Sequence, residues 1–120
     1  MQKIESYENL IAWQKSMDLA VLVYELTDKF PKEELYGLTS QLKRAAISIP
    51  SNIAEGSRRG TKKDFRNFLF NSFGSGAELE TQIKLAKRLK YGIRDDYVET
   101  DKLLDEVMRM LNKLVSSLEE

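Results

Sequence analysis

The sequence predicts an all-α protein, a single domain built as an up-down-up-down antiparallel four-helix bundle. Long segments carry apolar residues at the spacing of an α-helix, and no segment alternates apolar and polar residues as an exposed strand would. Only two Pro and six Gly occur among the 120 residues, mostly where helices would end or bend. The connections left between the helical segments are short, so consecutive helices are expected to pack antiparallel.

The first two helices are expected over residues 8–29 and 33–58. Ser6 is a suitable N-cap for the first helix, and Pro31 would stop it. An acidic pair at the start of the second helix suits the positive end of a helix dipole, although Leu38 is an equally good first residue.

The third and fourth helices are expected over residues 62–90 and 96–118. Thr61, with an acidic residue three positions later, resembles a capping box at the start of the third helix. Gly92 fits the left-handed position after that helix, and Asp95 is a suitable N-cap for the fourth.

Pro50 lies inside the second predicted helix, where it removes a hydrogen bond and clashes with the preceding turn. Apolar and small residues nevertheless keep one helical phase across it: Leu38, Leu42, Ala45, Ala46, Ile49, Ile53 and Gly56. We therefore predict one helix kinked at Pro50. The alternative is a helix that ends near Ser48, followed by a loop to Thr61.

The first helix has two apolar sides rather than one. One stripe comprises Leu10, Trp13, Met17, Ala20, Val21 and Tyr24, and the opposite one comprises Ile11, Leu19, Leu22 and Leu26. A helix of an isolated bundle leaves one side in water, so a second apolar side implies a second partner. We expect the second stripe to be the interface of a homo-oligomer. The alternative is that other parts of the same chain cover it.

Gly74 and Gly76 lie in the middle of the third predicted helix. Each costs about 1 kcal/mol relative to Ala in a helix. The expected reason is close approach of another backbone, and the alternative is a hinge.

The composition argues against catalysis. The chain has no Cys and no His, which excludes disulfides, thiol chemistry, imidazole mechanisms and the usual zinc sites. Glu78 and Glu80 are two residues apart on a helix and point in different directions, so they do not form an acid–base pair. We expect no enzymatic activity, no cofactor and no metal. There is also no apolar run long enough to span a membrane and no apolar signal core, so a cytoplasmic location is expected.

The net charge is zero, but the charges are unevenly placed. The middle of the chain carries two basic clusters. The first comprises Arg58, Arg59, Lys62, Lys63 and Arg66, and the second comprises Lys84, Lys87, Arg88, Lys90 and Arg94. In a bundle they lie at opposite ends, since about 33 Å of helix separates them. The first cluster, repeated around an oligomer, would form a basic rim that binds nucleic acid. The alternative is a solvated loop whose charge is offset by acidic residues near both termini.

Four segments occur in an order and spacing that resemble one family: ENLIAWQKSMDLA (8–20), YGLTSQLKRAA (36–46), SIPSNIAEG (48–56) and GSGAELETQI (74–83). They resemble the bacterial four helix bundle protein family, also called 23S rRNA intervening-sequence proteins. The resemblance implies a four-helix bundle that assembles into a ring-shaped homopentamer, with no catalytic activity. A related branch, the accessory variability proteins of diversity-generating retroelements, binds nucleic acid and a reverse transcriptase. Those relatives are strongly basic, whereas this chain is neutral.

Within the family motif, Pro50 would supply the bend and Gly56 would permit close packing. Asn52 and Glu55 would bond backbone groups exposed by the bend, or reach a neighbouring subunit.

Arg44 would pair with Glu78 or Glu80 of the third helix. The function expected from the whole sequence is a non-enzymatic oligomeric module that binds structured nucleic acid, RNA or DNA, or a ribonucleoprotein. The alternative is a scaffold for a protein partner with no nucleic-acid role. Other copies of the chain are also expected partners, and a membrane is not.

Overall fold

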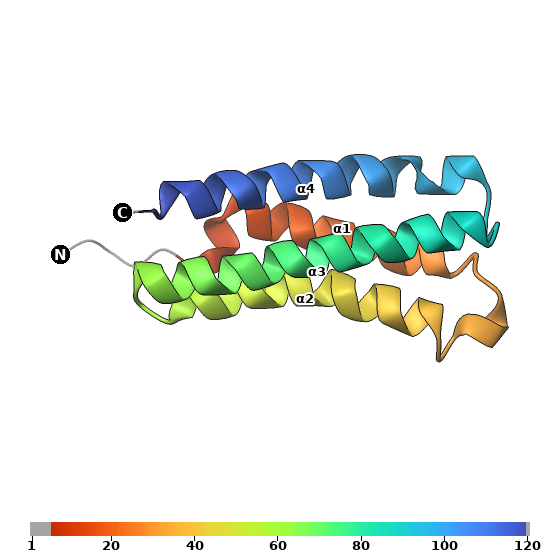
Figure 1. The fold of residues 1–120 in the computed structure, drawn as a ribbon, viewed down its shortest axis with the longest axis horizontal. Helices are drawn as coiled ribbons and strands as arrows, with labels where there is room; N and C mark the ends of the chain where they lie inside the picture. The colour runs from red at the N-terminus through yellow and green to blue at the C-terminus, as the bar shows by residue number, and fades with distance from the viewer. Residues whose placement is uncertain (1–5, 120) are drawn as a thin grey trace.

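A computed structural model describes residues 6–119. Four long helices lie side by side, namely α1 (Ile11–Thr27), α2 (Leu38–Arg58), α3 (Lys62–Arg88) and α4 (Val98–Ser117) (Figure 1). Each helix has its main contacts with two others, in the cyclic order α1, α2, α3, α4. The described residues include no strand, so the all-helical prediction is confirmed. The α2–α3 turn lies at the same end of the bundle as the start of α1 and the end of α4, and the other two connections lie at the far end (Figure 1).

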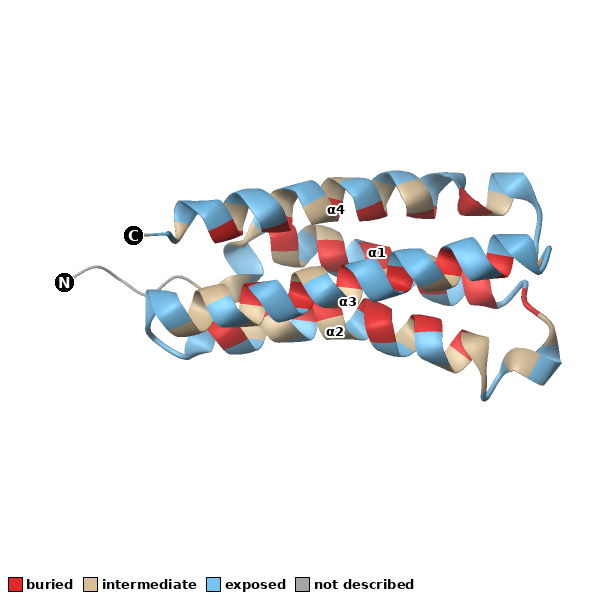
Figure 2. Cartoon of the chain, in the orientation of Figure 1, coloured by how far each residue is buried: buried red, intermediate tan, exposed pale blue. Residues whose placement is uncertain are grey.

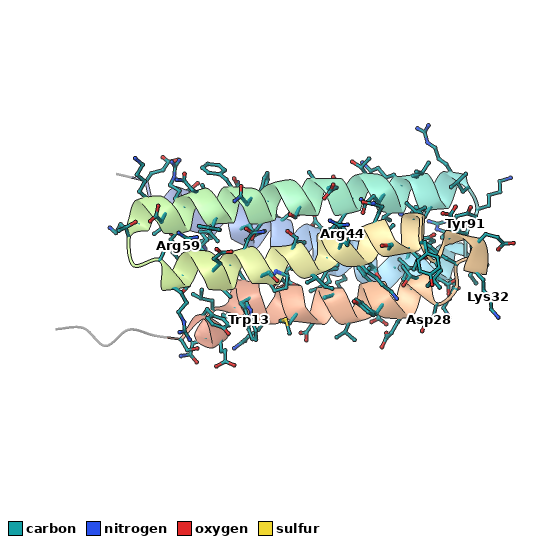
Figure 3. All side chains as sticks on the ribbon, turned by 90° about the horizontal axis from the view of Figure 1, so that it is seen from below. Trp13, Asp28, Lys32, Arg44, Arg59 and Tyr91 are labelled. Atoms are coloured by element: carbon teal, nitrogen blue, oxygen red, sulfur yellow. The ribbon has the colours of Figure 1, made fainter. Side chains whose placement is uncertain are left out.

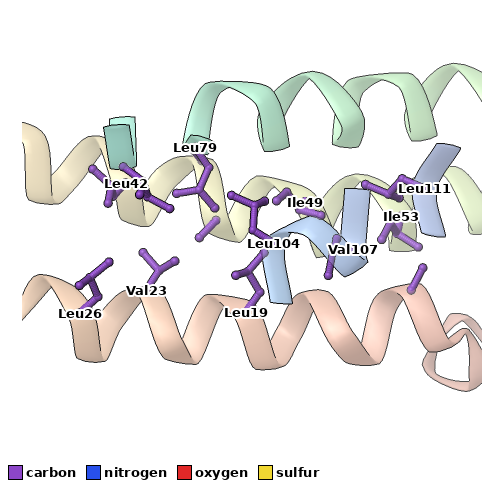
Figure 4. Packing of buried hydrophobic residues seen from close by; sticks show 14 of the residues in the cluster. Leu19, Val23, Leu26, Leu42, Ile49, Ile53, Leu79, Leu104, Val107 and Leu111 are labelled. Carbon is purple, nitrogen blue, oxygen red and sulfur yellow. The ribbon is translucent and has the colours of Figure 1, made fainter. Parts of the chain in front are cut away.

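The core runs along the whole bundle axis. Buried residues recur once per turn on the inward side of every helix (Figure 2). Leu19, Ile49, Leu104 and Val107 meet near its centre (Figure 4). Burying each such side chain contributes about 1.5–3 kcal/mol, which makes this apolar stripe the main stabilising feature of the fold.

Short 3-10 helices, η1 (Tyr7–Asn9) and η2 (Lys32–Glu34), precede α1 and α2. Ser6 Oγ accepts a hydrogen bond from the Glu8 amide at 3.1 Å, so Ser6 caps η1 rather than α1. The second long helix begins at Leu38 and not at Glu33, because the chain turns between η2 and α2. Glu34 Oε1 accepts from the Leu38 amide at 3.0 Å and so satisfies one of the free donors at the start of α2.

A third 3-10 helix, η3 (Arg94–Tyr97), precedes α4. Its capping group is Asp96, whose Oδ2 accepts from the Ile93 amide at 2.8 Å. The expectation that Asp95 caps the fourth helix is therefore wrong. Because these residues already form η3, α4 itself begins at Val98.

The end of α3 also differs from the expectation. Lys90, with φ +62°, occupies the first left-handed position, while Gly92 is left-handed at φ +71° two residues later. The Lys90 amide donates to Lys87 O at 3.0 Å and the Tyr91 amide donates to Ala86 O at 3.1 Å. This is the Schellman pattern with a lysine where glycine is usual. It holds a residue with a side chain in a conformation that costs about 1–2 kcal/mol.

α2 continues through Pro50 without a break, so the alternative of a helix ending near Ser48 is wrong. Side chains bond two carbonyls just before the proline. Asn52 Nδ2 donates to Ser48 O at 2.9 Å, and the buried Ser72 Oγ of α3 donates to Ile49 O at 2.8 Å. The Ser72 bond ties α2 to α3, and the Asn52 bond lies within α2, where the proline interrupts the backbone ladder. A kink angle at Pro50 stays a prediction.

The two glycines of α3 have different surroundings. A Cβ on Gly76 would collide with the Met108 thioether of α4, so Gly76 makes room for a side chain and not, as expected, for another backbone. A Cβ on Gly74 would meet nothing within 4 Å. Within residues 6–119, no contact therefore accounts for Gly74.

Candidate nucleic-acid interface

The α2–α3 turn brings the first basic cluster to one end of the bundle. α2 ends at Arg58, and Gly60 turns the chain with φ +90°, a conformation that residues with a side chain rarely adopt. Thr61 Oγ1 then accepts from the Asp64 amide at 3.1 Å, which starts α3. The turn places Lys62 on the first turn of α3, close to the end of α2 and exposed to solvent.

Three arginines of this cluster rest on aromatic rings. The guanidinium carbons of Arg58, Arg59 and Arg66 lie 5.4, 4.9 and 5.0 Å from ring centroids. The rings belong to Tyr7, Phe68 and Phe70, in that order. Such contacts contribute about 0.5–1 kcal/mol at exposed sites, and they orient the guanidinium groups without neutralising them.

Two of the five cations have carboxylate partners. Arg59 Nη2 lies 2.9 Å from Glu55 Oε2, and Arg66 Nη2 lies 3.2 Å from Glu119 Oε1. Within residues 6–119, Arg58, Lys62 and Lys63 have no ion-pair partner. Glu55 and Glu119 thus offset part of the cluster, and three of its cations stay without such a partner in this part of the chain.

A hollow lies beside these three cations. Its lining is Ser6, Ser57, Arg58, Gly60, Thr61, Lys62 and Phe65. Hydroxyl groups, a guanidinium and an ammonium therefore surround a concave surface at the positive end of α3. This combination of donors and positive charge suits a phosphate group.

The second basic cluster lies at the far end of the bundle, as expected (Figure 1). There Lys87 Nζ donates to Asp101 Oδ2 at 2.6 Å. The Tyr91 hydroxyl donates to Glu34 Oε2 at 2.7 Å, which joins the η2 segment to the α3–α4 connection. The hydrogen bonds from the Leu38 amide and from this hydroxyl lower the pKa of Glu34. The same hydrogen bond with Glu34 raises the pKa of Tyr91. The pKa of Tyr97 is raised to about 12, mainly by burial and to a smaller extent by the negative charges of Asp96 and Asp101.

The family-motif residues are only partly placed as expected. Gly56 packs closely on α3, since a Cβ there would lie 2.5 Å from Phe68 Cβ. Asn52 bonds backbone near the proline, but Glu55 pairs with Arg59 instead.

The expected pair of Arg44 with Glu78 or Glu80 does not form. Arg44 is exposed on α2 (Figure 3), and among the described residues no ion pair joins it to either glutamate. All three side chains are exposed to solvent.

The residues expected to form the oligomer interface divide between core and surface. Leu19 and Leu26 are 0% and 2% exposed and belong to the core of one chain, so they cannot contact a second copy. Ile11 is exposed and Leu22 is half-buried. The core side of α1 includes Ser16, whose buried hydroxyl is satisfied by Trp13 O at 2.8 Å. Because a polar residue lies on the core side, the sequence pattern does not show which of the two apolar sides of α1 faces inward.

The exposed apolar side of α1 forms one wall of a groove, and α2 forms the other. The groove is lined by Tyr7, Trp13, Met17, Ala20, Val21, Tyr24, Glu25, Asp28, Ile47, Pro50, Ser51 and Ala54. Trp13 and Asp28 mark its two ends along α1 (Figure 3). We call this surface the α1–α2 groove. Its α1 wall includes Trp13, Met17, Ala20, Val21 and Tyr24 of the first apolar stripe, whereas the second stripe was expected to be the interface.

Neither a metal site nor a membrane span emerges from the described residues. Across residues 6–119, no three His, Cys, Asp or Glu side chains are grouped so that they could hold a metal ion. None of the helices in that range is both long and apolar enough to cross a membrane.

Comparison with known proteins gives a family and a fold. The sequence profile of the family described as 23S rRNA-intervening sequence protein matches residues 8–113. Among solved structures, the chain is similar to a protein of unknown function from the S23 ribosomal protein family of Bacteroides thetaiotaomicron. The two are 23% identical, with a TM-score of 0.78 over 88% of this chain and 98% of that one. At this identity the likeness shows the fold alone. No curated protein matches this chain.

Proposed function

Because the chain belongs to the 23S rRNA-intervening sequence protein family, we propose that it is a non-enzymatic, oligomeric module that binds structured RNA, alone or within a ribonucleoprotein. The α2–α3 turn is its contact surface. The observation that carries the proposal is the convergence of five cations there, of which only Arg59 and Arg66 have carboxylate partners within the described chain.

The site fits backbone phosphates better than bases. Arg58 and Lys62 flank a hollow at the positive end of α3, where a phosphate oxygen can accept several hydrogen bonds. The aromatic rings of the site lie beneath the arginines instead of presenting open faces on which bases could stack. Recognition would then depend on the shape of the folded RNA, with little preference for sequence.

Oligomerisation is the second part of the proposal. The α1–α2 groove exposes Met17, Val21 and Ile47 at 42%, 57% and 43%. A contiguous apolar surface of this kind is typical of a protein–protein interface. We propose that copies of this chain cover it, in a ring that is a pentamer by resemblance. Repetition of the α2–α3 turn around the ring would multiply the phosphate contacts of one subunit.

The test is a titration of a fluorescently labelled hairpin RNA against the wild type and a variant with four charge reversals, Arg58→Glu, Arg59→Glu, Lys62→Glu and Lys63→Glu. Binding by the wild type and its loss in the variant would support the proposal. Equal affinities would reject the α2–α3 turn as the site.

A matched control reverses two arginines and two lysines elsewhere on exposed surface: Arg94→Glu, Lys102→Glu, Arg109→Glu and Lys113→Glu. It breaks one ion pair between residues four apart, Arg109 with Asp105 at 3.1 Å, just as the test variant breaks the pair of Arg59 with Glu55. It should retain the RNA affinity of the wild type within about threefold. If neither the wild type nor the control binds RNA at low salt, the exposed groove favours the protein-scaffold function instead.

A further inference from the structure

Another hollow lies at the far end of the bundle, between the last turn of α3 and the first turns of α4. Its volume is about 820 Å³, within the range of about 300–1,000 Å³ that is typical of ligand sites. We call it the α3–α4 hollow. The length of α3, 27 residues or about 40 Å of helix, separates it from the α2–α3 turn (Figure 1). A ligand of this hollow is therefore remote from the proposed RNA contact.

Cations surround the α3–α4 hollow. Its lining includes Lys87, Lys90, Arg94 and Lys102. Among the described lining residues Asp101 alone is acidic, and Lys87 pairs with it at 2.6 Å. Lys90, Arg94 and Lys102 are exposed, and no ion pair joins them to a carboxylate within residues 6–119. The rim therefore carries three positive charges that lack a partner in that part of the chain.

The neighbouring acidic residues lie on another side of the bundle. Asp95, Asp96 and Glu99 line a smaller hollow between α1 and α4. Asp96 is also engaged there, since its carboxylate lies 3.9 Å from Lys29 Nζ of α1. The zero net charge of the whole chain thus conceals a local separation of charge around the start of α4. An acidic ligand can approach the α3–α4 hollow from the α3 side, away from these three carboxylates.

The rest of the lining is mainly apolar. Ile93 and Val98 belong to it and are 66% and 55% exposed. Its two tyrosines contribute ring carbon and no free hydroxyl, because Tyr97 donates to Tyr91 O at 2.6 Å and Tyr91 donates to Glu34 Oε2 at 2.7 Å. The hollow at the α2–α3 turn differs, since three hydroxyl side chains line it. The two ends of the bundle therefore suit ligands of different chemistry.

The backbone at Lys90 supports a binding role for this rim. Its φ of +62° is a left-handed conformation that glycine adopts without strain and lysine does not. Residues held in such conformations cluster at functional sites. Glycine at this position would relieve the strain but would remove one ammonium group from the hollow. A ligand that uses this ammonium group would account for the lysine.

RNA matches the α3–α4 hollow poorly. Phosphates would meet cations on its rim, but bases would find no open aromatic face on which to stack. Tyr97 is 3% exposed, and the Tyr91 ring packs against Phe30 with 5.5 Å between the ring centroids. The exposed aliphatic side chains favour an apolar group of the ligand, as in the core of a protein–protein interface.

We infer that the α3–α4 hollow binds an acidic segment of a partner protein. Carboxylates of the segment pair with the three cations of the rim, and one apolar side chain rests on Ile93 and Val98. Such a segment complements both the charge and the apolar lining of the hollow. The site depends neither on the RNA contact nor on the oligomer. Together with the proposed RNA contact, it makes the bundle an adaptor that joins an RNA at one end to a protein at the other.

The test is fluorescence anisotropy with labelled short peptides of Asp and Glu, in which one Leu, Phe or Trp occupies each position in turn. At least one peptide should bind the wild type more tightly than its counterpart with Ser in place of the apolar residue. Its affinity should fall about eightfold in Lys90→Gly/Arg94→Gln/Lys102→Gln, roughly twofold for each exposed ion pair lost. Lys90→Gly alone should bind more weakly and yet unfold at a higher temperature, which a folding defect cannot produce.

The matched control is Lys32→Gln/Lys84→Gln/Arg88→Gln. It also removes two lysines and one arginine that are exposed, have no ion-pair partner within residues 6–119 and lie toward the same end, but none of them lines the hollow. It should keep the peptide affinity of the wild type within about twofold. Circular dichroism of each variant confirms folding.

Three outcomes would overturn the inference. They are no peptide binding at low salt, equal losses in the test and control variants, and equal binding of the Ser counterparts. Loss of affinity for a hairpin RNA, but not for peptide, in the test variant would also overturn it and would make the hollow a nucleic-acid site. Lys62→Gln/Lys63→Gln should leave the peptide affinity unchanged, so a failure of the proposed RNA contact is distinguishable from a failure of this site.

Discussion

Replacing Gly56 by alanine tests the close packing of α2 on α3. The added Cβ would lie 2.5 Å from Phe68 Cβ and 3.2 Å from Phe65 Cδ1. Carbon atoms pack at about 3.5–4.0 Å, so the two helices would have to separate by about 1 Å. Phe68 Cβ is attached directly to the backbone of α3 and cannot swing away. Overpacking of this kind costs about 1–3 kcal/mol, against a gain of up to about 1 kcal/mol in helix propensity.

Gly74→Ala is the matched control, because its Cβ enters open space within one chain. It should stabilise the protomer by about 0.5–1 kcal/mol. The free energies of unfolding of the two variants should therefore differ by about 2 kcal/mol. With a urea m-value of about 1–3 kcal/mol/M, their midpoints would differ by about 1 M.

Both variants are best measured in a Val21→Glu background, which places a charge in the α1–α2 groove and keeps chains apart. Equal midpoints for Gly56→Ala and the parent protein, with unchanged m-values, would refute the packing argument.

Three further changes test other parts of the structure. Lys90→Gly should raise the free energy of unfolding by about 0.5–1 kcal/mol in thermal denaturation, because glycine adopts the φ of +62° without the strain that lysine has there. A lower melting temperature would count against a strained cap. The pKa of Glu34 in the folded chain is lower than the usual value of 4.5. The ionised Glu34 carboxylate therefore stabilises the fold above pH 4.5, and this stabilisation is lost as the pH falls through the folded-state pKa. Glu34→Gln should then weaken the fold in urea at pH 7 but not at pH 2, and equal losses at both would contradict this linkage. Leu19→Ala should cost about 2–5 kcal/mol and Leu22→Ala clearly less, because Leu19 is fully buried and Leu22 only half-buried; the reverse order would show that the core side of α1 is misassigned.

The number, type and approximate bounds of the helices could be predicted from apolar spacing and from Pro and Gly placement. Continuity through Pro50 could also be predicted, because seven apolar or small residues keep their phase across it. The helix ends were less predictable. Lys90 occupies a position where glycine is preferred, and Asp96 caps η3 where its neighbour Asp95 looks equivalent in sequence. Which residue caps a helix in such a connection depends on hydrogen bonds that form only once the connection has its folded conformation.

The inward side of α1 could not be chosen from the sequence. Its two apolar sides have similar composition, and the side that faces the core carries Ser16 and Thr27, both buried. Their hydroxyls bond to carbonyls of the preceding turn, which removes the cost of burying them. The basic cluster was predictable as a group, because one short turn holds it. Its partial neutralisation by Glu119 depends on how the C-terminal end of α4 lies against the start of α3.

The most direct test of the central claim is the dependence of RNA affinity on salt for the wild-type protein. If Arg58, Lys62 and Lys63, which lack ion-pair partners within residues 6–119, bind phosphates, the logarithm of the association constant should fall linearly with the logarithm of the salt concentration. Each phosphate contact adds about 0.7–0.9 to the slope, so Lys62→Gln/Lys63→Gln should flatten it by about 1.5 for every subunit engaged. An RNA affinity that does not change with salt, or a slope that is unaffected by these two substitutions, would contradict the account.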